Sequence, residues 1–88
     1  MNTIEIYTLP TCPYCIKAKE LLKDNYLDFN EYDISHDEEN MRKELSDTFD
    51  LQGIATVPQI IINGQHIGGY TELQKIVSNG QLNKYLHN

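Results

Sequence analysis

The two cysteines of this chain are the residues whose type and spacing most directly suggest chemistry. They stand in the run Cys12-Pro13-Tyr14-Cys15, and the 88-residue sequence contains no other cysteine. Two thiols separated by two residues can meet at the first turn of a helix and pass between a dithiol and a disulfide. The spacing therefore predicts thiol–disulfide exchange.

Two other uses of a cysteine pair compete with this interpretation. A free cysteine can be a small core residue, and two thiolates can form half of a tetrahedral zinc site. Zinc needs two further ligands, yet the three histidines are scattered and form no paired ligand motif. We favour redox chemistry over both alternatives and expect no metal.

The two sulfurs are expected to have different roles. Pro13 suits the first position of a helix, so Cys12 should lie at the helix N-terminus, where N–H groups and the dipole stabilise a thiolate. Cys15 falls one turn later on an apolar stripe with Ala18 and Leu22, where burial favours the neutral thiol. We expect Cys12 to attack and Cys15 to resolve the mixed disulfide.

The elements around this motif predict one domain over residues 1–88. Apolar periodicity predicts strands over residues 3–7, 27–34, 57–62 and 65–67. Helices should follow residue 12, Ser35 or Asp37, and residue 71, with a short last helix near residue 82. Asn63-Gly64 predicts a two-residue hairpin turn. The strand–helix–strand unit should be parallel and the last two strands antiparallel, which gives an α/β fold with a four-stranded mixed sheet.

Some local expectations are more detailed. The apolar stripe of the first helix should continue to Tyr26, and residues 53–56 should form a loop. Thr71 with Gln74 three residues on fits a capping box at the start of the last long helix. His66 is expected to be a surface strand residue rather than a catalyst.

Composition excludes several function classes. The formal net charge of −6 argues against non-specific binding to nucleic acid, which needs a basic surface. No apolar run approaches bilayer length, and the N-terminus lacks the blocks of a signal peptide. We therefore expect a cytoplasmic monomer that binds no membrane, in a compartment where a cysteine pair is redox-active rather than a structural disulfide.

Four motifs in order along the chain resemble those of dithiol glutaredoxins. They are Tyr-Thr-x-x-Thr-Cys-Pro-Tyr-Cys at residues 7–15, Ala18-Lys19 with Leu21-Leu22, Thr56-Val57-Pro58, and Ile67-Gly68-Gly69-Tyr70. The resemblance implies a thioredoxin-like fold with strand order 2-1-3-4 and glutathione-linked reduction of protein disulfides and glutathione mixed disulfides. The monothiol branch carries Cys-Gly-Phe-Ser, which this chain lacks.

The resemblance also implies a glutathione site. Thr56-Val57-Pro58 would be a cis-proline loop that faces the cysteines, with the Val57 backbone pairing with the glutathione cysteine as an added strand. Gly68-Gly69 would let the tripeptide approach the backbone, and N–H groups at Thr71 would hold its γ-glutamyl carboxylate. The full expected set is Tyr14, Thr56, Val57, Pro58, Gly69, Tyr70, Thr71 and Glu72.

Two departures from the family pattern remove positive charge. Many glutaredoxins carry Lys or Arg three residues before the first cysteine and just before Thr-Val-Pro, where this chain has Leu9 and Ala55. Losing a charge-assisted hydrogen bond of about 1–3 kcal/mol would weaken glutathione binding roughly 5- to 150-fold. We expect weak glutathione affinity, with Gln59 or Lys19 compensating in part.

Three hypotheses follow for the physiological role. The leading one is a glutathione-dependent reductase of protein disulfides, with ribonucleotide reductase as one candidate acceptor. A second is a glutaredoxin-like redoxin reduced by thioredoxin reductase, although such redoxins usually carry Ser-Gly-Phe in place of Gly-Gly-Tyr. A third is a [2Fe-2S] carrier held by Cys12 and glutathione, and Pro13 argues against it because relatives that do this usually lack that proline.

Overall fold

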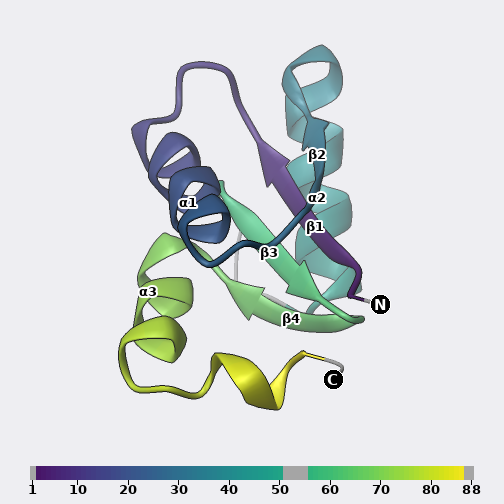
Figure 1. Cartoon of the computed structure of the whole chain (residues 1–88). Helices are drawn as coiled ribbons and strands as arrows, with labels where there is room; N and C mark the ends of the chain where they lie inside the picture. The colour runs from purple at the N-terminus through teal and green to yellow at the C-terminus, as the bar shows by residue number, and fades with distance from the viewer. Residues whose placement is uncertain (1, 51–55, 87–88) are drawn as a thin grey trace.

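The structure is a computed structural model that describes residues 2–50 and 56–86 (Figure 1). Its strands are β1 (Ile4–Thr8), β2 (Asn30–Asp33), β3 (Gln59–Ile62) and β4 (Gln65–Gly68), and its α-helices are α1 (Pro13–Asp24), α2 (Glu38–Thr48) and α3 (Tyr70–Ser78). Short 3₁₀ turns cover Ser35–Asp37 and Leu82–Lys84.

The strands form one mixed sheet in the order β2-β1-β3-β4. β1 pairs with β2 in parallel and with β3 antiparallel, and β3 pairs with β4 antiparallel. Figure 1 shows α1 and α3 together on one face of the sheet and α2 on the other. The predicted α/β class and strand order are therefore confirmed.

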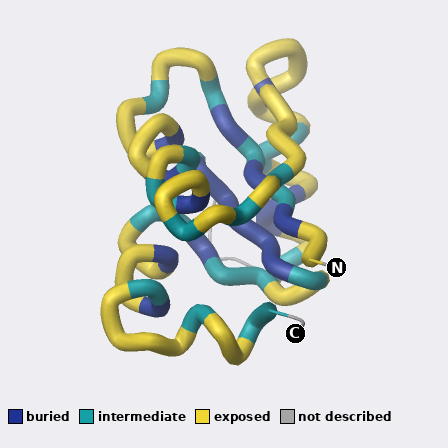
Figure 2. The backbone as a smooth tube through the Cα atoms, viewed as in Figure 1, coloured by how far each residue is buried: buried dark blue, intermediate teal, exposed yellow. Residues whose placement is uncertain are grey.

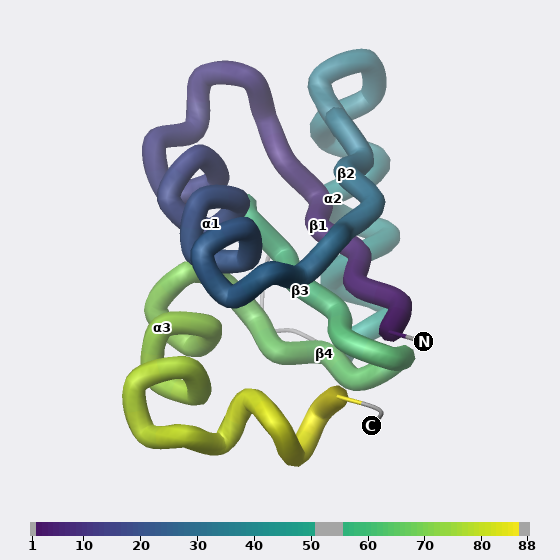
Figure 3. The backbone as a smooth tube through the Cα atoms, in the orientation of Figure 1, coloured from purple at the N-terminus to yellow at the C-terminus, as the bar shows by residue number. Residues whose placement is uncertain are grey.

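The main core lies between the sheet and the pair α1 and α3, which lie side by side (Figure 3). Alternation along β1 buries Ile4 and Ile6 on this face, as the sequence pattern predicted. The cluster consists of Ile4, Ile6, Ala18, Leu22, Ile60, Ile62, Leu73 and Ile76. Figure 2 shows how buried residues gather along the central strands. This packing holds the start of α1 next to the end of β1.

The predicted extension of the α1 stripe to Tyr26 is wrong. The helix ends at Asp24, and Tyr26 has a positive φ of 60° with 96% of its surface exposed. The Leu27 N–H instead returns to the Leu22 carbonyl (3.0 Å), so that Leu27 packs against the core. The left-handed Tyr26 turns the chain one residue before Leu27, whose apolar side chain is partly buried against the core.

Two strands are shorter than predicted. The ladder between β1 and β2 begins at Asn30, opposite Glu5. Residues 27–29, which were predicted to belong to this strand, therefore lie before it. β3 begins at Gln59 rather than at residue 57. Pro58 has no N–H to donate to a ladder, which explains why the strand starts after it.

The predicted capping box at Thr71 is also wrong. α3 begins at Tyr70, its N-cap is Gly69 in an extended conformation, and no side chain caps it. Gly68, with a φ of 118°, turns the chain early, so Thr71 becomes the second helical residue. The Asn63-Gly64 hairpin is confirmed by positive φ angles of 50° and 83°.

Residues 53–55 of the predicted loop lie outside the described residues. They include Ala55, one of the two positions where many glutaredoxins carry a basic residue. Within the described ranges, none of the helices is long and apolar enough to span a membrane.

Candidate active site

The turn between β1 and α1 places Cys12 at the helix N-terminus. The Cys12 N–H donates to the Leu9 carbonyl (3.2 Å), and Pro13 follows as the first helical residue. Cys12 is the N-cap of α1, where its Sγ accepts the N–H of Cys15 at 3.1 Å. The sulfur accepts a backbone N–H of the first helical turn, as a Ser or Asp oxygen does at other helix N-termini. An N–H that points at this sulfur stabilises negative charge there.

Cys15 lies one turn further along α1 and faces inward. Only 1% of its surface is exposed, whereas Cys12 is half-buried. Burial, with the hydrogen bond to Cys12 as a smaller cause, raises the pKa of Cys15 to about 12. At neutral pH Cys15 is therefore a neutral thiol with little access to solvent. The geometry agrees with the predicted asymmetry between the two sulfurs.

The loop before β3 reaches the dithiol from a distant part of the sequence. The Val57–Pro58 peptide bond is cis. The Val57 carbonyl oxygen lies 3.6 Å from Cys12 Sγ, across 45 residues of sequence, and accepts a hydrogen bond from the thiol. Thr56 is exposed, Val57 half-buried and Pro58 buried. The structure thus brings the expected Thr56–Pro58 segment against Cys12.

The N-terminus of α3 adjoins the same loop. A side chain at Gly69 would come within 3.5 Å of the Pro58 carbonyl oxygen, so the two backbones approach closely. The first N–H groups of a helix have no partner within it, and here they belong to residues 70–72. The Glu72 side chain folds back over Gly68, where an added Cβ would lie 3.1 Å from the Glu72 Cγ.

Two tyrosine rings, one from the Cys-x-x-Cys motif and one from the start of α3, contact each other. The rings of Tyr14 and Tyr70 lie 6.0 Å apart at an angle of 31°. Tyr14 is 56% exposed, and the Lys17 ammonium lies 5.3 Å from its ring centroid. Sequence reasoning assigned no role to Lys17, although its spacing from Tyr14, three residues along a helix, places the two side chains on one face.

The two residues that we expected to replace the missing cation have other partners. Lys19 forms an ion pair with Glu31 at 2.9 Å, and Glu31 also accepts the Thr8 hydroxyl at 2.8 Å. The Lys19 hydrogen bond, followed by that of Thr8, lowers the pKa of Glu31. Gln59 is buried and donates to the Thr56 carbonyl at 2.7 Å.

His66 lies in strand β4, as predicted, but it is less exposed than a surface residue. It is half-buried, its ring stacks on Phe49 with centroids 4.6 Å apart, and its Nε2 lies 2.6 Å from Gln59 Oε1. Alternation in β4 could not reveal this, because Phe49 comes from the end of α2.

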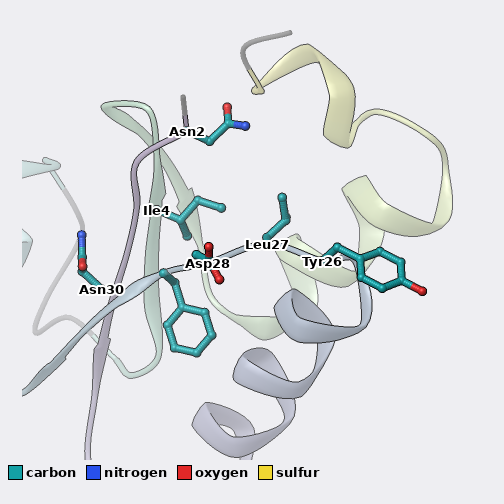
Figure 4. Close-up of a pocket in the computed structure, with 7 residues that line it drawn as sticks. Asn2, Ile4, Tyr26, Leu27, Asp28 and Asn30 are labelled. Atoms are coloured by element: carbon teal, nitrogen blue, oxygen red, sulfur yellow. The ribbon is translucent and has the colours of Figure 1, made fainter.

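Two further features of the described residues bear on the chemistry. No group of three or more His, Cys, Asp or Glu side chains in these ranges is arranged to hold a metal ion. A hollow of about 330 Å³ lies at the far end of β1 from the cysteines (Figure 4). Its lining includes Ile4 and Tyr26, whereas Cys12 follows the opposite end of the strand, so it forms no part of the dithiol site.

The thioredoxin-like sheet and the Cys12–Cys15 pair together define a thiol–disulfide oxidoreductase. The particular family follows from sequence comparison: the glutaredoxin family model matches residues 4–67, and the chain belongs to this family. Glutaredoxin 1 of Rickettsia prowazekii is 41% identical over 88 residues, which cover 98% of this chain and 88% of the relative.

Solved structures agree with this assignment. The dithiolic glutaredoxin 2-C-Grx1 of Trypanosoma brucei brucei is 31% identical with a TM-score of 0.81, over 98% of this chain and 88% of that one. A buckwheat glutaredoxin solved in complex with glutathione has a TM-score of 0.84 at 22% identity, over 97% of this chain and 76% of that one, and shares the fold.

Proposed function

We propose that this protein is a glutathione-dependent oxidoreductase that reduces protein disulfides and glutathione mixed disulfides through Cys12 and Cys15. The observation that carries the proposal is the position of Cys12 Sγ, 3.1 Å from the Cys15 nitrogen and 3.6 Å from the Val57 carbonyl oxygen. An accessible sulfur at a helix N-terminus beside an extended backbone segment suits attack on a peptide disulfide.

Reduction of a protein disulfide proceeds in two exchanges. The Cys12 thiolate attacks one substrate sulfur, forms a mixed disulfide and expels the other substrate sulfur as a thiolate. Cys15 then loses its proton and attacks the Cys12 sulfur, which releases the second substrate thiolate and leaves a Cys12–Cys15 disulfide. Two glutathione molecules reduce this disulfide and become oxidised glutathione.

A glutathione mixed disulfide needs only Cys12. The thiolate takes the glutathione sulfur and expels the protein thiolate, and a second glutathione then attacks the sulfur of the bound glutathione, which releases Cys12 as a thiolate. Cys15 is not consumed in this route. The buried position of Cys15 suits a thiol that acts only after a mixed disulfide has formed.

The glutathione site proposed for this chain consists of the residues around Cys12 described above. The Val57 backbone would pair with the central cysteine of the tripeptide, between Thr56 and Pro58, while Tyr14 and Tyr70 flank it. N–H groups at Thr71 would receive the γ-glutamyl carboxylate. The Glu72 carboxylate, which lies over Gly68, would meet the amino group, and Gly69 leaves room for the approach.

Position 9 holds Leu instead of Lys or Arg, and this lack of positive charge supports weak binding of glutathione. Lys19 pairs with Glu31 and Gln59 donates to Thr56, so neither residue is free to replace the missing positive charge. The same observation favours a second candidate function, reduction by thioredoxin reductase. Ribonucleotide reductase as acceptor, a cytoplasmic location and a monomeric state stay predictions.

Two coupled assays that follow NADPH oxidation separate these candidates. One assay contains glutathione and glutathione reductase, and the other contains thioredoxin reductase. Both use a protein disulfide as substrate. We expect glutathione-dependent turnover in the first assay and little turnover in the second. Turnover only with thioredoxin reductase would overturn glutathione dependence and establish the second candidate.

A further inference from the structure

A buried hydrogen-bonded link joins β4 to the loop that faces Cys12. Gln59 is 4% exposed, its Nε2 donates to the Thr56 carbonyl oxygen at 2.7 Å, and its Oε1 lies 2.6 Å from His66 Nε2. Each end of the Gln59 amide therefore has a partner within the protein. We call these three residues the His66–Gln59–Thr56 link.

The direction of each hydrogen bond in the link follows from the Thr56 carbonyl. A carbonyl oxygen only accepts, so the Gln59 amide nitrogen must face Thr56 and its oxygen must face His66. The oxygen accepts from His66, which therefore carries its hydrogen on Nε2. Burial lowers the pKa of His66, against a smaller opposite effect of Glu72, so the neutral Nε2–H form predominates at neutral pH.

His66 is itself held in place from two sides. It stands opposite Ile61 in the β3–β4 ladder, and side chains two residues apart along β3 share a face, so His66 and Gln59 meet on the α2 face of the sheet. Phe49, the residue that ends α2, stacks on the imidazole with an interplanar angle of 17°. The link therefore has a fixed donor at its far end.

The near end of the link lies next to the reacting sulfur. Thr56 precedes Val57, whose carbonyl oxygen lies 3.6 Å from Cys12 Sγ. A hydrogen bond to the Thr56 carbonyl restrains rotation of the Thr56–Val57 peptide unit, and that unit contains the Val57 N–H. The orientation of this N–H decides how a peptide backbone can pair with the loop.

We propose that His66 is a positioning residue that acts through Gln59 to orient the Thr56–Val57 backbone for peptide substrates of Cys12. The part of this inference that concerns glutathionylated substrates rests on the proposed function. His66 touches no reacting atom. Its effect should appear in substrate binding and much less in the intrinsic reactivity of the Cys12 sulfur.

The test uses His66→Phe, which removes the Nε2–H donor but keeps an aromatic ring for Phe49. His66→Gln restores a donor near the Nε2 position, and His36→Phe, in the exposed 3₁₀ turn, is the matched control. Losing the hydrogen bond should raise KM for a glutathionylated peptide about 2- to 12-fold in His66→Phe, with kcat changing less. His66→Gln should recover most of this loss, and His36→Phe should leave KM unchanged.

Two further measurements distinguish positioning from general damage to the fold. Cys12 should react with 4,4′-dithiodipyridine, which has no peptide backbone, with a smaller loss in His66→Phe than the peptide shows. Gln59→Met should mimic His66→Phe, and the double variant should add little to either single change, because both remove one link. This pair keeps the inference testable if one variant folds poorly.

Several outcomes overturn the inference. They are a KM within about twofold of the parent in both His66→Phe and Gln59→Met, an equal loss with dithiodipyridine, and no recovery in His66→Gln. If the parent itself shows no saturable use of glutathionylated peptide, the proposed function fails instead. The ¹³C shift of the Thr56 carbonyl then still decides this inference, since it should move in His66→Phe without any substrate.

Discussion

The sulfur of Cys12 accepts a hydrogen bond from the backbone of Cys15, at 3.1 Å, while the sulfur of Cys15 is buried beneath it. One helical turn thus gives the two cysteines different environments, an N-cap position for Cys12 and a core position for Cys15. The division of roles proposed above depends on this relationship, and four predictions test it and its surroundings.

Replacing each cysteine in turn should separate the two exchange routes. Cys12→Ser should abolish both exchange routes, because Cys12 is the more accessible of the two cysteines. Cys15→Ser should retain reduction of a glutathionylated peptide but lose most reduction of a protein disulfide, since the mixed disulfide is no longer resolved. Steady-state rates with each substrate measure this. A greater loss for Cys15→Ser on the glutathionylated peptide would contradict the assignment.

The alkylation of Cys15 should depend steeply on pH. A raised pKa means that the thiol stays protonated as pH rises through the ordinary cysteine value of about 9 and ionises only near 12. Cys12→Ser removes the smaller cause of this raised pKa but keeps the burial of Cys15, so its rate with iodoacetamide should still rise about tenfold per pH unit up to pH 9 without levelling off. A plateau in the rate at or below pH 9 would show that Cys15 is not held as a neutral thiol.

A positive charge at position 9 should strengthen glutathione binding. The backbone of Leu9 forms the turn that holds Cys12, so a side chain there is close to the dithiol. We expect Leu9→Lys to lower KM for glutathionylated peptide about 5-fold or more, whereas Leu9→Gln, with similar reach and no charge, should change it much less. The gain should shrink at high salt. Equal effects of Lys and Gln would contradict the account of weak affinity.

The two glycines before α3 should respond differently to alanine. Gly68 has a φ of 118° and would place a Cβ 3.1 Å from Glu72 Cγ, so Gly68→Ala should cost about 1–3 kcal/mol of unfolding free energy. Gly69 has an ordinary φ of −95°, and its Cβ would make a normal contact at 3.5 Å. Urea unfolding of both variants measures the difference, and a larger loss for Gly69→Ala would refute this ordering.

The sequence predicted those parts of the site that local chemistry determines. Pro13 and the apolar spacing from Cys15 to Leu22 were enough to place Cys12 at the start of α1 and Cys15 within it, and Asn63-Gly64 was enough to place the hairpin. The errors at Tyr26 and Thr71 arose where one backbone residue with positive φ changed the start or end of a helix. Periodicity of side chains carries no information about such a reversal.

The His66–Gln59–Thr56 link was beyond prediction for a different reason. Gln59 and His66 belong to neighbouring strands, but the ring that stacks on His66 is that of Phe49, the C-cap residue of α2. Similarly, the ion pair of Lys19 with Glu31 joins α1 to β2 and removes a cation that the sequence had left free. Both contacts depend on how helices pack on the sheet.

The most direct test of the central claim is to locate the glutathione adduct. Cys15→Ser incubated with oxidised glutathione should gain one glutathione, and mass spectrometry of its peptides should place this adduct on Cys12. Cys12→Ser treated in the same way should gain little, because the Cys15 sulfur is buried and protonated. Stable modification of Cys15, or no adduct on Cys12, would contradict a glutathione-dependent oxidoreductase that attacks through Cys12.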